Sequence, residues 1–131
     1  MTIFVDTSAL YALLDEDDRN HRKAADLWAA TVPTAYLATH AYVVIETSAL
    51  VQRRLGMGAV GQLHDGLLAA VETAPIDLTT HHVAVTRWLG SGVRHLSLVD
   101  VTSFVFMSQA GIDRALAFDD DFIDAGFELV R

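Results

Sequence analysis

Short apolar runs alternate along the chain with longer amphipathic segments. Runs of strand length occupy positions 3–5, 35–38, 75–78, 114–118 and 127–130. Patterns typical of helices cover 9–14, 21–31, 40–55, 59–72, 81–89 and 98–109, with a short helix near Phe122 and expected N-caps at Asn20, Thr39, Thr80 and Ser97. Strands that alternate with helices in this way predict a parallel α/β sandwich.

The first apolar run ends abruptly in a polar group. Residues 3–5 read Ile-Phe-Val, which is typical of a strand buried on both faces of a parallel sheet, and Asp6 follows directly. Open α/β sheets bind ligands at the carboxyl ends of their strands. We therefore expect Asp6 to be the first member of an acidic active site.

Composition limits the class of protein. The chain has 131 residues, which predicts a single domain spanning 1–131. No cysteine is present and no signal-peptide pattern precedes Asp6, so a cytoplasmic location is expected. No apolar run approaches the roughly 18 residues of a membrane span, so no membrane association is expected. Because 52% of the residues are hydrophobic, we expect some apolar surface to be buried against another protein chain.

The formal charge of −8 argues against a passive nucleic-acid coat protein, which would need a basic surface. An enzyme that acts on nucleic acid remains possible. Bound divalent cations reverse the local field of clustered carboxylates.

Two acidic residues stand alone in otherwise apolar helices. Glu46 lies within AYVVIETSALV at 41–51, where a carboxylate is costly to bury unless it is paired or binds a cation. The alternative is a solvated Glu46 paired with Arg53. Asp100 has its own structural explanation, because Ser97 and Asp100 match a helix capping box. That geometry still allows the Asp100 carboxylate to face a cleft.

A third acidic group, Asp119-Asp120-Asp121, follows the predicted strand at 114–118 and repeats the pattern of the first strand. Helix capping would explain it as well, whereas a calcium-binding EF-hand loop does not fit the residues that follow. The carboxyl ends of parallel strands share one edge of a sheet. Carboxylates that converge there without cysteine or a histidine motif favour hard cations such as Mg²⁺ or Mn²⁺, which can activate water for phosphodiester cleavage.

The order of these motifs resembles the PIN-domain ribonucleases, and most closely the VapC-type toxins of bacterial toxin–antitoxin pairs. The resemblance rests on VDTSAL at 5–10, the mid-helix Glu46, LSLVD at 96–100 and AFDDDF at 117–122, and it covers nearly the whole chain. It implies a PIN-like three-layer α/β/α sandwich with a short-stranded, mainly parallel central sheet. It also implies a Mg²⁺- or Mn²⁺-dependent endoribonuclease that cleaves RNA by metal-activated water.

The resemblance assigns roles by position. Asp6, Glu46, Asp100 and Asp119 would form the catalytic, metal-binding quartet, with Asp121 as a second-rank ligand and Ser8 and Thr7 as supporting residues. The implied partners are an RNA substrate, a cognate VapB-type antitoxin, a second copy in a homodimer, and the toxin–antitoxin hetero-oligomer that these form. The chain has one lysine, so candidate RNA-binding cations are mostly arginines: Arg19, Arg22, Lys23, Arg53 and Arg54.

Two other classes remain open at this point. The acids could serve only as helix caps in a catalytically inactive PIN-like interaction module. An aspartate-based phosphatase would use Asp6 as a nucleophile, but such enzymes need a second aspartate where this chain has Ser8. Stabilisation by Mn²⁺ would oppose the first class, and a covalent phosphate on Asp6 would support the second.

Overall fold

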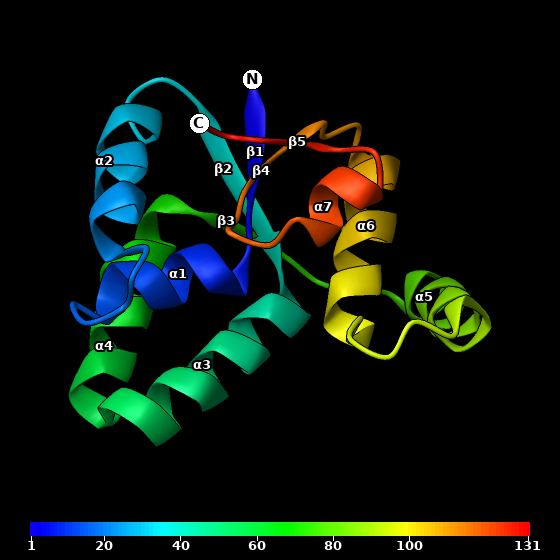
Figure 1. Ribbon diagram of the computed structural model, residues 1–131, viewed down its shortest axis with the longest axis horizontal. Coiled ribbons are helices and arrows are strands. Elements are labelled where there is room, and N and C mark those ends of the chain that lie inside the picture. The colour runs from blue at the N-terminus through cyan, green and yellow to red at the C-terminus, as the bar shows by residue number, and fades with distance from the viewer.

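A computed structural model describes residues 1–131, and its core is a five-stranded parallel sheet (Figure 1). The strands are β1 Thr2–Val5, β2 Tyr36–His40, β3 Glu72–Ala74, β4 Arg114–Leu116 and β5 Glu128–Leu129. The helices are α1 Thr7–Leu14, α2 His21–Thr31, α3 Ala41–Leu55, α4 Met57–Asp65, α5 Leu78–Ser91, α6 Leu98–Ala110 and α7 Asp121–Asp124, with a 3₁₀ turn η1 at Leu67–Ala70.

The strand order β3-β2-β1-β4-β5 puts the first strand in the centre. Phe4 pairs with Ala38 of β2 on one side and with Ala115 of β4 on the other. The chain therefore builds outward from β1 in one direction and later returns to its opposite side. Ligands of open α/β sheets bind at such a reversal, outside the carboxyl ends of the strands. That position lies between the end of β1 and the end of β4.

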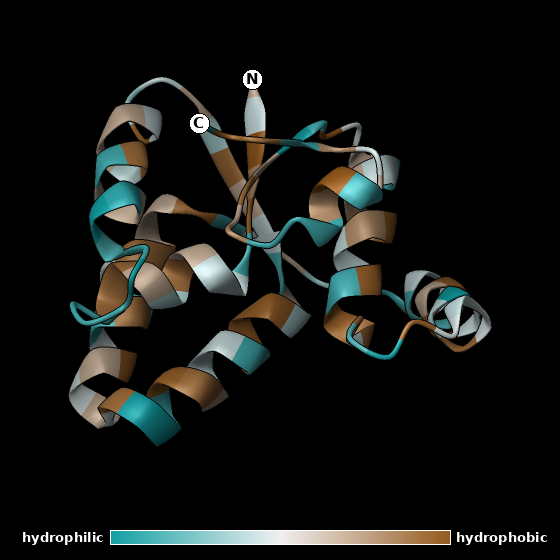
Figure 2. Ribbon diagram, in the orientation of Figure 1, coloured by the Kyte–Doolittle hydropathy of each residue, from teal (hydrophilic) through white to brown (hydrophobic).

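Helices cover both faces of the sheet. In Figure 1, α1, α2 and α4 lie on one side of the strands, and α5, α6 and α7 lie on the other. A core cluster of 18 buried residues includes Phe4, Leu10, Leu63, Met107 and Phe122. Figure 2 shows apolar residues along the central strands and polar residues on the connection between α1 and α2. The predicted α/β/α sandwich with a parallel sheet is confirmed.

The predicted third strand at 75–78 is wrong. The strand is Glu72–Ala74, and Pro75 begins the connection to α5. The helix expected over 59–72 also ends early, at Asp65, and is followed by η1. The apolar residues 67–71 fit a helix or a strand equally well. In the structure 67–70 form η1, and the strand that pairs with β2 begins at Glu72.

Two of the four expected caps also differ, and a third makes no capping hydrogen bond. Asp77, rather than Thr80, caps α5 and accepts a hydrogen bond from Thr80 N at 2.7 Å. His40, rather than Thr39, caps α3, because the Thr39 hydroxyl donates instead to the Val5 carbonyl at 2.8 Å. Asn20 precedes α2 but its side chain makes no capping hydrogen bond. No helix of the fold is both long enough and apolar enough to cross a bilayer.

Candidate active site

Asp6 is held rigidly at the end of the central strand. It is the N-cap of α1 and is only 5% exposed. Its Oδ2 accepts hydrogen bonds from Ser8 N at 3.2 Å and from Ser8 Oγ at 2.8 Å. Ser8 Oγ in turn accepts from Phe118 N at 3.0 Å, just beyond the end of β4. The Ser8 hydroxyl thus links the ends of β1 and β4 and fixes the Asp6 carboxylate between them.

Glu46 reaches the same region from α3. Its side chain is half-buried, and the Arg53 ion pair considered from the sequence is absent: the only ion pairs are His95–Asp121 and Arg114–Glu128. Burial raises the pKa of Glu46, a hydrogen bond from Thr7 opposes the rise, and the charge of Asp100 adds to it. Thr7 Oγ1 also accepts from Thr47 Oγ1 at 2.9 Å, so α1 and α3 meet beside the carboxylate.

The expected capping box at the start of α6 is confirmed. Asp100 N donates to Ser97 Oγ at 3.1 Å, and Ser97 N donates to Asp100 Oδ2 at 3.0 Å. Burial raises the pKa of Asp100, the Ser97 hydrogen bonds oppose this, and the neighbouring charge of Asp119 raises it further. Asp100 therefore has both of the features weighed from the sequence. It caps its helix, and its carboxylate faces other acids.

The acids after β4 complete the group. One carboxylate oxygen from each of Asp100, Asp119 and Asp121 lies within 4.8 Å of the others, a spacing that could hold a metal ion. Asp119 Oδ1 accepts from Asp121 N at 2.9 Å, which shapes the turn into α7. Burial raises the pKa of Asp119, and the charge of Asp121 contributes to the rise.

Electrostatic contacts join the whole set. Burial is the largest cause that raises the pKa of Asp6, to about 6; the Ser8 hydrogen bonds oppose it, and the charges of Asp100 and Glu46 add to it. Asp6 and Glu46 are not part of the 4.8 Å group, but the charges of Asp6, Glu46 and Asp100 influence one another, so acids from the end of β1, α3, α6 and the β4–α7 turn lie near one edge of the sheet. Such a set stores mutual repulsion that a bound cation would relieve.

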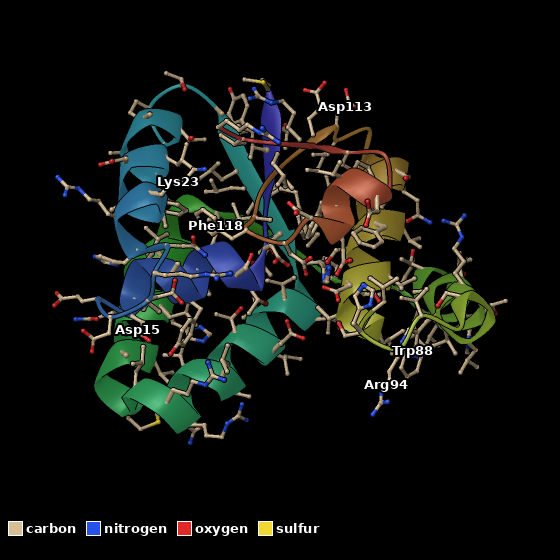
Figure 3. All side chains as sticks on the ribbon, viewed as in Figure 1. Asp15, Lys23, Trp88, Arg94, Asp113 and Phe118 are labelled. Carbon is tan, nitrogen blue, oxygen red and sulfur yellow. The ribbon has the colours of Figure 1, made fainter.

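The candidate RNA-binding cations do not gather as one group. All five are exposed. The Arg54 guanidinium lies 5.5 Å from the centre of the Tyr11 ring, so it packs on α1. Lys23 lines a cavity with Phe118 and Asp120, next to the turn that carries Asp119 (Figure 3). Of the five, Lys23 has the clearest contact with a segment of the acidic site.

Two histidines that the sequence left without a role make specific contacts. His95 Nε2 lies 2.9 Å from Asp121 Oδ1, at the edge of the acidic group. His40 is fully buried, and its Nδ1 accepts from Tyr42 N at 3.2 Å while its Nε2 contacts Ser103 Oγ at 2.8 Å. His40 thereby connects the start of α3 to α6, the two helices that carry Glu46 and Asp100. The contacts of His95 with Asp121 and of His40 with Ser103 have no local sequence signal, because these partners are distant in the chain.

Replacing Ser8 by alanine should show how much the Ser8 hydroxyl, which holds Asp6 in place, contributes to the stability of the protein. The Ser8→Ala protein loses one hydrogen bond to Asp6 and leaves Phe118 N without its acceptor. We expect a loss of about 1–3 kcal/mol in unfolding free energy. Urea denaturation measures this loss. Ser48→Ala is the control, because it also removes a hydroxyl with two hydrogen-bond partners, Val44 O and His64, neither of which belongs to the acidic site. Equal losses in the two variants would contradict a special role for Ser8.

Comparison with known proteins identifies the family. The PIN domain family model matches residues 3–128. The 23S rRNA-specific endonuclease VapC20 of Mycobacterium tuberculosis is 40% identical over 98% of both chains. Its crystal structure, described as a sarcin–ricin loop cleaving toxin, superposes with a TM-score of 0.89 at 36% identity, over 98% of both chains.

More distant structures share the fold alone. VapBC2 from Rickettsia felis, bound to a DNA fragment from its promoter, matches at TM-score 0.71 and 11% identity over 99% of this chain and 98% of that one. FitAcB from Neisseria gonorrhoeae matches at 0.67 and 18% identity over 100% and 97%. The family match over nearly all residues and the 40% identity are decisive. The chain belongs to the PIN-domain ribonucleases and, within them, to the VapC-type toxins of toxin–antitoxin pairs.

Proposed function

We propose that this endoribonuclease cleaves RNA at a Mg²⁺ or Mn²⁺ site whose ligands are Asp6, Glu46, Asp100 and Asp119, with Asp121 as an additional ligand. The convergence of three carboxylates within 4.8 Å at the edge of the sheet carries this proposal. The raised pKa of Asp6, caused mainly by burial, supports it, because a buried carboxylate without a counter-charge destabilises the fold.

The donor set fits a hard cation. The proposed ligands are carboxylate oxygens, which suit Mg²⁺ and Mn²⁺, whereas neither cysteine nor a paired histidine motif is available for a softer metal. Bound there, such an ion would supply Lewis-acid stabilisation of the phosphate and a more acidic water. The chain's own residues set the geometry: Ser8 holds Asp6, Ser97 holds Asp100, and Thr7 contacts Glu46. These contacts keep the carboxylates in place before any ligand enters.

The substrate that we propose is a hairpin loop of 23S ribosomal RNA. Support comes from the 40% identity to a 23S rRNA-specific endonuclease and from the likeness to the structure of a sarcin–ricin loop cleaving toxin. Lys23, next to the turn after β4, is the best-supported contact to the RNA backbone, and Arg19, Arg22, Arg53 and Arg54 are proposed as more peripheral ones. A cation near the site would offset its strong negative field for an approaching phosphate.

A VapB-type antitoxin and a second copy of the chain are proposed as partners. Large apolar side chains remain exposed on several helices, among them Ile45 at 65%, Leu78 at 73% and Leu89 at 71%. Exposed apolar surface of this kind is typical of protein–protein interfaces.

Mn²⁺ should stabilise the native protein. A site present in the native state but not in the unfolded chain adds about 2.7 kcal/mol at a hundred times the dissociation constant, which is several degrees in Tm. The measurement is Tm in metal-free buffer against increasing MnCl₂. Asp100→Asn should lose the response, whereas Asp113→Asn should keep it, because Asp113 lies at the opposite end of the sheet (Figure 3). A wild-type Tm that does not respond at millimolar Mn²⁺ would favour the inactive interaction module.

A further inference from the structure

A cavity of about 340 Å³ opens directly beside the acidic group, between the α5–α6 connection and α7. Its walls are mostly apolar, with Val93 and Leu96 from the connection and Phe104 from α6. Its polar groups are the carboxylates of Asp121 and Asp124 and the imidazole of His95. The cavity falls within the range of about 300–1,000 Å³ typical of small-ligand sites.

The cavity and the acidic group share a wall. Asp121 belongs to the carboxylate cluster with Asp100 and Asp119, and it also lines the cavity. His95 bonds to the same Asp121 carboxylate at 2.9 Å. A ligand held in the cavity would therefore lie next to whatever is bound at the carboxylates, because Asp121 borders both.

Hydrogen bonds fix the segment that forms the outer wall. Trp88 Nε1 donates to the Leu96 carbonyl at 2.9 Å, and Val93 N donates to Ser91 Oγ at 3.2 Å. Figure 3 shows Trp88 and Arg94 together at this end of α5. The connection is thus tied back to its own helix, and the cavity is formed before a ligand arrives.

The chemistry of the walls selects the occupant. A phosphate would meet two carboxylates and is disfavoured by charge. A nucleobase is neutral, offers a flat apolar face to Val93 and Phe104, and carries polar groups on its edge. Carboxylates only accept hydrogen bonds. They match best the bases with an exocyclic amino group, which guanine, adenine and cytosine have, whereas uracil offers only its N3–H as a donor.

We propose that this cavity binds one unstacked nucleobase of the RNA, adjacent to the cleaved phosphodiester, and prefers a base with an exocyclic amino group. This proposal rests on the proposed endoribonuclease activity and adds a determinant of its specificity. Asp124 lies in the cavity but outside the carboxylate cluster, so it is the hydrogen-bond acceptor that remains available to a base when Asp121 is occupied.

The test uses two matched substitutions and one RNA. Val93→Trp fills the cavity, and Val32→Trp is its control, because both valines are 38% exposed and Val32 lies beyond α2, outside the cavity. The substrate is an RNA hairpin that the wild-type protein cuts, together with versions in which each nucleotide near the cut is made abasic in turn. Steady-state cleavage gives KM and kcat for each pair of protein and RNA.

We expect Val93→Trp to raise KM about tenfold, within the range measured for loss of one base-stacking contact, while Val32→Trp leaves KM unchanged. One abasic position should raise the wild-type KM similarly and have no further effect in Val93→Trp, because both changes remove the same contact. Uridine at that position should raise the wild-type KM by less than the abasic nucleotide does, because uracil keeps the flat face and lacks only the exocyclic amino group. The Tm response to Mn²⁺ should be intact in Val93→Trp, which separates loss of base binding from damage to the carboxylates.

Several results would overturn the base-binding cavity. Equal KM values for Val93→Trp and wild type, or abasic effects that add to the substitution, mean that no base enters it. A change in oligomeric state in Val93→Trp alone, seen by light scattering, means that the cavity is part of an interface between chains. Failure of the wild-type protein to cut any RNA would instead overturn the proposed function.

Discussion

Asp6→Asn and Asp100→Asn should each reduce the rate of RNA cleavage by roughly a thousandfold. Asparagine keeps the size of the side chain and one acceptor oxygen, so the Ser8 contacts to Asp6 and the Ser97 contacts to Asp100 can persist. It removes the negative charge that would hold the cation. Loss of metal-based stabilisation of the transition state is worth several kcal/mol, and about 4 kcal/mol corresponds to a factor of a thousand.

The measurement is cleavage of a labelled RNA hairpin in Mg²⁺ or Mn²⁺, with far-UV circular dichroism to show that each variant is folded. Asp113→Asn serves as the control, because it makes the same change from carboxylate to amide at an exposed position at the other end of the sheet (Figure 3). Normal cleavage by both the Asp6 and the Asp100 variants would show that the acidic site is assigned wrongly.

The same variants address the aspartate-phosphatase alternative. Such a mechanism needs a second carboxylate two residues after the nucleophile to handle protons. Here the Ser8 hydroxyl occupies that position, and it is engaged between Asp6 Oδ2 and Phe118 N. Asp6 is thereby positioned as a fixed acceptor of hydrogen bonds, which suits a metal ligand better than a nucleophile. Membership of the ribonuclease family points the same way.

The acids were predictable from the sequence because each breaks a strong local pattern. Asp6 ends an apolar strand, and Glu46 and Asp100 interrupt apolar helices. Asp6 and Asp119 were expected at one edge of the sheet, because the carboxyl ends of parallel strands lie at the same edge. In the structure they follow the adjacent parallel strands β1 and β4. The third strand was misplaced because Glu72–Ala74 is polar at two of its three positions and lies between two more apolar stretches, so only its pairing with β2 reveals it.

The histidine contacts and the cavity could not be predicted, because they depend on tertiary packing. His40 directly precedes α3, next to a threonine that is a better cap by preference, yet Thr39 instead donates to β1. His95 meets Asp121 across 26 positions of the chain. The cavity is formed by residues from the α5–α6 connection, α6 and α7, whose packing no local pattern encodes.

Asp6 and His40 should have opposite effects on the pH dependence of stability. Burial raises the pKa of Asp6 from 3.8 to about 6, so the folded state binds the proton more tightly and stability falls as pH rises through that window. Burial lowers the pKa of His40 from 6.5 to about 4, so the unfolded state binds the proton more tightly and stability rises with pH over nearly the same window. The two contributions largely cancel in the wild-type protein.

Asp6→Asn should remove one side of this balance. In metal-free buffer we expect the unfolding free energy of Asp6→Asn, relative to wild type, to increase by about 3 kcal/mol between pH 4 and pH 7, since each pKa unit is worth about 1.4 kcal/mol. The variant should then lose more stability than wild type on acidification, because only Glu46, Asp100 and Asp119, whose pKa values burial also raises, still offset the contribution of His40. Urea denaturation at several pH values measures both curves. A difference that stays constant from pH 4 to pH 7 would mean that Asp6 is not the buried, destabilising charge. Saturating Mn²⁺ should raise the stability of the wild-type protein at pH 7, because the bound ion neutralises the Asp6 charge.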